Sequence, residues 1–130
     1  MNIVEYIKSL PNMRCVKKAS DLDISIAENE LGLSFSEEYK SVLKNLGAVR
    51  ACGHEINGFT DAPAINVIEM TKSAREFEKI PNDMYVFESL GIDDIMMLQN
   101  ASGEVFQCYN GKITHAAGSI LDYLKSAIDS

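Results

Sequence analysis

Residues 28–47 constrain the fold of this chain more than any other segment, because they encode the end of one helix and the whole of the next. Gly32 supplies the left-handed residue that commonly ends a helix. After a short loop, Ser36 is a typical N-cap, and the apolar residues that follow recur at positions i, i+3, i+4 and i+7: Tyr39, Val42, Leu43 and Leu46. This spacing predicts a helix that ends at Gly47 and buries one apolar face.

Other helices are predicted where apolar residues recur at the same spacing, at residues 2–10, 21–31, 73–80 and 119–128. Ser20 with Asp23, and Ser119 with Asp122, form capping boxes at the starts of the second and the last of these helices. Within the helix at 73–80, the apolar residues that share a face are expected to be buried: Ala74, Phe77 and Ile80.

Short β-prone segments fill much of the remaining chain, at residues 48–52, 54–59, 84–90, 95–99, 104–110 and 112–115. Asn110 and Gly111 between the last two are a strong hairpin signal. Residues 11–19 are expected to be a polar connector. This order predicts one α+β domain over residues 1–130, a mostly antiparallel sheet of short strands packed against N-terminal helices and a closing C-terminal helix.

Composition and charge exclude several classes of protein. The formal charge of −7 argues against direct nucleic-acid binding, which needs clustered Lys and Arg. No apolar run reaches the roughly 18 residues of a membrane span. The 3 cysteines are far apart without a C-x-x-C pair, and the N-terminus lacks the pattern of a signal peptide. We therefore expect a cytoplasmic protein with reduced thiols.

The acidic residues are unevenly distributed. Between Lys79 and Lys112 there is no Lys or Arg, and the acids in this window are Asp83, Glu88, Asp93, Asp94 and Glu104. They are our hypothetical contact face for a basic protein partner, and a solvated surface that maintains solubility is the alternative. Asp93 and Asp94 are adjacent in a predicted turn, where solvated acids are favoured over a divalent-ion site.

The reactive side chains form no convincing catalytic or metal-binding pattern. Cys52 and His54 would share one face of an extended strand, and with Cys108 and His115 they suggest a Cys2His2 site. The short ligand spacings of such sites are missing. A Cys52–His54 nucleophile pair is similarly weak, because an acidic chain raises thiol pKa values if anything. We expect no metal, no cofactor and no catalytic residues.

Three segments resemble, in order, the SUKH superfamily. The first is Glu28-x-x-Leu31-Gly32 with Phe35-Ser36-Glu37-Glu38-Tyr39; the second runs from Tyr85 to Phe106; the third runs from Ser119 to Leu124. The positions that carry the resemblance, expected to be structural, are Glu28, Leu31, Gly32, Tyr39, Leu43, Gly47, Gly91, Gly103, Ser119 and Leu124. The chain departs from the family in having Ser36 in place of the usual proline and in lacking tryptophan.

This superfamily joins a yeast regulator of cell-wall synthesis to many bacterial immunity proteins. The resemblance implies a non-enzymatic, protein-binding role, in which a bacterial member binds and neutralises a toxin domain, often a nuclease. A basic toxin would suit the acidic window, and a monomer or weak homodimer is expected. The alternative is a regulatory scaffold or adaptor that binds an endogenous protein. An enzyme that uses Cys52 and His54 is a distant third.

Overall fold

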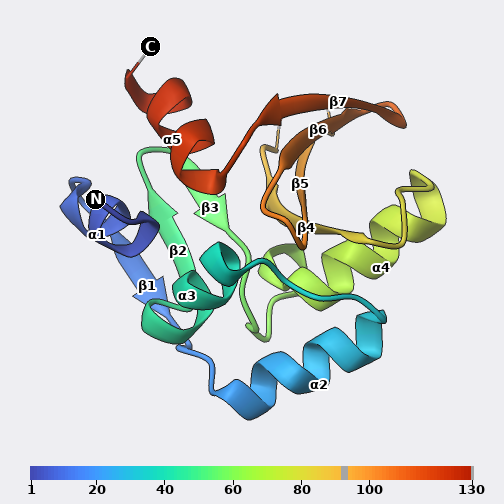
Figure 1. Cartoon of the computed structure of the whole chain (residues 1–130), viewed down its shortest axis with the longest axis horizontal. Helices are drawn as coiled ribbons and strands as arrows, with labels where there is room; N and C mark the ends of the chain where they lie inside the picture. The colour runs from blue at the N-terminus through green and yellow to red at the C-terminus, as the bar shows by residue number, and fades with distance from the viewer. Residues whose placement is uncertain (92–93, 130) are drawn as a thin grey trace.

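The structure is a computed structural model that describes residues 1–91 and 94–129 (Figure 1). The helices are α1 (Ile3–Ser9), α2 (Asp21–Leu31), α3 (Glu37–Asn45), α4 (Val67–Phe77) and α5 (Ile120–Asp129), with a 3-10 turn η1 (Pro63–Ile65). The strands are β1 (Arg14–Val16), β2 (Ala48–Ala51), β3 (His54–Ile56), β4 (Met84–Ser89), β5 (Met96–Asn100), β6 (Val105–Tyr109) and β7 (Lys112–Ala117).

The strands form one antiparallel sheet in which each pairs with its neighbours in sequence, from β1 at one edge to β7 at the other. The last four strands curl strongly, α4 lies alongside β4, and α5 returns from β7 toward α1 (Figure 1). The predicted α+β class and its antiparallel sheet are therefore confirmed. Among the described residues, no helix is both long and apolar enough to cross a bilayer.

Local sequence signals set the helix ends. Ser20 Oγ accepts a hydrogen bond from Asp23 N at 3.1 Å, and Asp23 Oδ2 accepts one from Ser20 N at 3.0 Å, which is the predicted capping box. Gly32 ends α2 with a φ of 66°, in the left-handed region. Ser36 caps α3 by accepting from the backbone N–H of Tyr39 at 3.0 Å.

The sheet has an apolar core on each face. The main core includes the predicted face of α3, whose Tyr39, Val42 and Leu43 are fully buried. In a second core, Ala74 of α4 and Ile80, which follows α4, pack against β4–β6. Because β4 is covered on both faces, four of its consecutive residues are buried instead of alternating.

Three sequence expectations about these elements are wrong. The connector at 11–19 contains β1, whose three residues pair with β2. Helix α4 begins at Val67 rather than at residue 73, because Asn66 caps it. Phe77 is 73% exposed instead of buried, because it is the last residue of α4 and points away from the core that receives Ala74 and Ile80.

Candidate functional site

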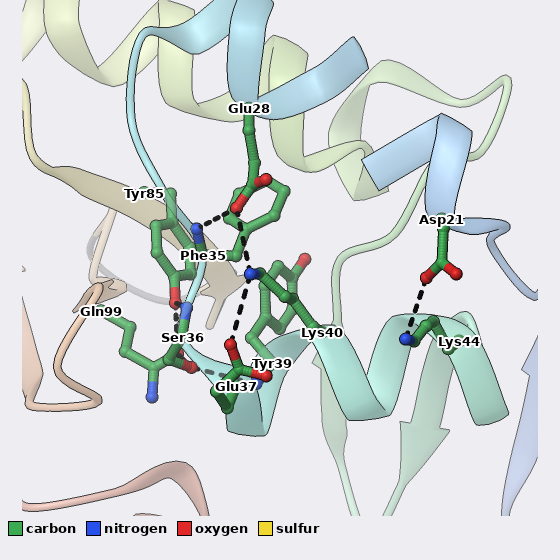
Figure 2. A network of polar contacts seen from close by, with 10 residues as sticks. All are labelled: Asp21, Glu28, Phe35, Ser36, Glu37, Tyr39, Lys40, Lys44, Tyr85 and Gln99. Atoms are coloured by element: carbon green, nitrogen blue, oxygen red, sulfur yellow. Dashed lines mark hydrogen bonds and ion pairs between the residues drawn. The ribbon is translucent and has the colours of Figure 1, made fainter. Parts of the chain in front are cut away.

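The first family segment ties the loop between α2 and α3 in place (Figure 2). Glu28, near the end of α2, accepts a hydrogen bond from the backbone N–H of Phe35 at 2.8 Å. The same oxygen lies 3.7 Å from Lys40 Nζ of α3. Glu28 therefore links the end of α2 to the following loop and to α3.

A buried polar chain continues from this loop into the sheet (Figure 2). Tyr85 OH of β4 accepts from Ser36 N at 2.9 Å and donates to Gln99 Oε1 at 2.6 Å. Ser36 Oγ donates to the same Gln99 oxygen at 2.9 Å. Burial raises the pKa of Tyr85, so that its hydroxyl remains protonated and able to donate.

The carboxylate of Glu38 anchors the closing helix. It projects from α3 and accepts from the first backbone N–H groups of α5, those of Ile120 at 2.7 Å and Leu121 at 2.9 Å. Gln99 Nε2 also donates to it at 3.0 Å. A carboxylate is favourable at the N-terminus of a helix, because the first N–H groups lack partners within the helix and the positive end of the helix dipole lies there. Sequence reasoning missed this role because the partners are 82 and 83 residues apart.

Glu88 of the hypothetical contact face is fully buried and cannot touch a partner. Its carboxylate lies 2.7 Å from His54 Nδ1 and accepts from Tyr123 OH at 2.5 Å. A bulge between Val86 and Glu88 sets this orientation: the extra residue, Phe87, turns Glu88 toward the main core. Glu88 joins β3, β4 and α5, and is thereby removed from the hypothetical face.

The same contact gives His54 a structural role. Its hydrogen bond to Glu88 raises the pKa of His54, although burial opposes this. Cys52, by contrast, is exposed in the β2–β3 turn with a φ of 51°. Cys108 is buried, and burial raises the pKa of its thiol, as does the charge of Glu78. Over residues 1–91 and 94–129, no group of three or more His, Cys, Asp and Glu residues is placed to hold a metal ion.

The remaining acids of the window do not share one site. Asp83 and Glu104 are exposed near one end of β4 and β5, where Met84 pairs with Asn100. Asp94 is exposed near the other end, where Ser89 pairs with Met96. A strand advances about 3.3 Å per residue, so these ends are roughly 15 Å apart. Asp93 lies outside the described residues.

Asp94 borders a hollow of about 210 Å³ between α4 and the β4–β5 connection, which we call the α4 hollow. The lining residues that matter here are Met70, Phe77, Glu78, Ser89, Asp94 and Met96. Its walls are mainly apolar, the exposed Phe77 is part of its lining, and the charged groups among its described lining residues are both carboxylates. An aromatic side chain at an apolar hollow is the kind of residue that can act as an anchor for a protein partner.

The fold defines an α+β protein with an all-antiparallel sheet, whose polar networks join its helices to that sheet. A family model, SUKH_5, described as SMI1-KNR4 cell-wall, matches residues 1–129. The chain belongs to this family, as the resemblance predicted. A comparison with curated proteins found no match.

Proposed function

We propose that this protein is a non-catalytic immunity protein that binds and neutralises a basic toxin domain. The observation that carries the proposal is the family match over residues 1–129, which suggests protein–protein interaction. The α4 hollow supplies a surface of suitable chemistry, with Glu78 and Asp94 beside the exposed ring of Phe77. Asp83 and Glu104, exposed farther along the sheet, add long-range attraction.

Electrostatics explains why such a partner would be basic. Nucleases contact phosphates through Lys and Arg, so their active surfaces carry positive charge. A chain of formal charge −7 attracts such a surface and speeds association with it. Acidic side chains bound to that surface would then exclude the nucleic acid. The structural use of His54 and the buried state of Cys108 support a role without catalysis.

A growth-rescue assay tests the proposal. Binding is first measured between the purified protein and each purified toxin domain encoded next to the gene for this chain. Each toxin is then expressed in a bacterial host with and without the protein. We expect a stable complex that weakens with salt, and restored growth for one toxin but not for unrelated toxins. Binding without rescue, or rescue of every toxin alike, would contradict neutralisation.

The family description favours one second candidate. Its words "SMI1-KNR4 cell-wall" suit a regulatory scaffold that binds an endogenous protein. In that case the gene would stand apart from toxin genes, and its deletion would alter sensitivity to cell-wall-damaging agents. The immunity proposal expects no such sensitivity. In either role we propose that the protein acts in the cytoplasm, as a monomer or weak homodimer.

A further inference from the structure

We propose that the α4 hollow is the pocket for a single arginine side chain of the partner protein. This inference rests on the proposed function insofar as it assumes a protein partner. The hollow has a volume of about 210 Å³, against about 30 Å³ for one water in the liquid. It therefore has room for a long side chain, and its lining contains both parts that an arginine requires.

Glu78 supplies the charge. It is the C-cap of α4, where the helix dipole disfavours an acid, and its side chain is half-buried. Among the described residues, no Lys, Arg or His lies within ion-pair distance of it. A partly buried carboxylate in this position is stabilised when a partner brings a cation to it. The preference against an acid at a helix C-terminus is a local rule, and such rules are commonly broken at functional sites.

The walls suit the stem and the plane of an arginine. Met70 and Met96 line the hollow, and methionine side chains adapt readily to an aliphatic stem. Phe77, 73% exposed at its margin, offers a ring face on which a guanidinium stacks. The geometry favours a flat cation on a long stem.

Ser89 adds a hydrogen-bond acceptor. Its Oγ is buried in the lining and has no hydrogen-bond partner in the part of the chain that the structure describes. A guanidinium carries five N–H donors, so an arginine that pairs with the carboxylate of Glu78 has further donors for Asp94 and, once the lining shifts to expose it, for Ser89. Lysine, with a compact ammonium, matches this spread of acceptors less well.

A second hollow acts as an internal control. It has a volume of about 180 Å³, lies over β1–β3, and is similarly apolar. Its charged lining differs: Arg14 and Arg50 face each other across β1 and β2, and Glu55 pairs with Arg50 at 2.8 Å. An arginine that enters by apolar contact alone would use both hollows, whereas one that follows the carboxylates would use only the α4 hollow.

The test is a titration of the full-length, 15N-labelled protein with three peptides, followed by amide chemical shifts. The peptides are acetyl-Gly-Gly-X-Gly-Gly-amide, with arginine, lysine or norleucine at X. We expect saturable shifts around Phe77, Glu78 and Ser89 with the arginine peptide, weaker ones with lysine, and none with norleucine. Shifts around Arg14 and Arg50 should be absent.

Variants identify the groups responsible. Glu78→Gln should weaken arginine-peptide binding about tenfold, as expected for the loss of a charge-assisted hydrogen bond. Asp61→Asn is the matched control, because it removes an acid whose side chain is 99% exposed and that is not part of the hollow. Equal weakening by both variants, equal binding of the norleucine peptide, or no saturable shift would overturn the proposal.

The outcomes separate this inference from the proposed function. Localised arginine binding without growth rescue would support the pocket and overturn toxin neutralisation. Growth rescue that Glu78→Gln leaves fully intact, together with unchanged toxin affinity, would support neutralisation and overturn the arginine pocket. The amide spectrum of Glu78→Gln, compared with that of the unaltered protein, verifies that the variant is folded in both experiments.

Discussion

Tyr123 of α5 donates a hydrogen bond to the buried carboxylate of Glu88 on β4, at 2.5 Å, and so attaches the last helix to the middle of the sheet. Glu88 also contacts His54 of β3 at 2.7 Å. Burial raises the pKa of Tyr123, and the charge and hydrogen bond of Glu88 raise it further, so the hydroxyl stays a donor. Glu88, which the sequence analysis assigned to a contact face, therefore links β3, β4 and α5.

Tyr123→Phe should lower the free energy of unfolding by about 1–3 kcal/mol, because it removes a hydrogen bond to a buried charge. Urea unfolding at neutral pH measures the change. Tyr109→Phe is the matched control, since Tyr109 is 43% exposed, and it should leave stability nearly unchanged. If both variants lost the same stability, the Tyr123–Glu88 contact would contribute nothing specific.

His54 should make stability depend on pH. Its pKa in the folded protein is raised above its ordinary value of 6.5, chiefly by the hydrogen bond to Glu88. This contribution is fully present below pH 6.5, and it is lost as pH rises through the folded-state pKa. Urea unfolding over this range should show a decline that His54→Gln removes. An NMR titration of His54 should give a pKa above 6.5, and a lower value would refute the assignment.

Glu38→Ala should loosen α5, because it removes the acceptor of two N–H groups at the start of that helix. We expect a loss of about 1–3 kcal/mol and faster hydrogen exchange at Ile120 and Leu121. Glu37→Ala is the neighbouring control: that side chain is 93% exposed and its ion pair is with Lys40. It should leave exchange in α5 unchanged. Equal effects of the two variants would mean that Glu38 acts only through general charge.

Gly47→Ala should destabilise the protein far more than Gly32→Ala. Both glycines have positive φ, 88° and 66° respectively, so both variants incur backbone strain of about 1–2 kcal/mol. A Cβ on Gly47 would also lie 2.2 Å from the carbonyl oxygen of Val16, whereas one on Gly32 would meet nothing within 4 Å. Thermal and urea unfolding should show the difference, and similar losses would argue against close contact between Gly47 and β1.

Phe77→Ala should separate binding from folding. Because Phe77 is 73% exposed, its removal should change the free energy of unfolding by no more than about 0.5 kcal/mol. Affinity for the partner should fall by about 2 kcal/mol or more if the ring is an anchor. Leu22→Ala, which truncates a 68% exposed side chain on α2, is the control for loss of exposed apolar surface. Equal affinities of the two variants would exclude the α4 hollow from the interface.

Local sequence signals were sufficient for much of the architecture. The capping residues Ser20 and Ser36, the glycine stop at Gly32 and the hairpin signal at Asn110 depend on neighbours a few residues away, so their effect can be deduced from the sequence. The buried face of α3 followed from helical periodicity. Strand β1 escaped detection because its three residues carry no alternation, and pairing with β2 defines it as a strand.

The assignment of acids to surface or interior was decided only by the tertiary structure. Glu88 and Asp94 are acids of the same window, yet a one-residue bulge turns Glu88 into the core, whereas Asp94 is exposed beside the α4 hollow. Glu78 and Phe77 became candidate binding residues because the structure places both at the α4 hollow and leaves Phe77 exposed. The sequence alone determined most of the elements and the family, because these follow from local preferences and motif order. The candidate site depends on contacts between distant segments, which only the folded chain brings together.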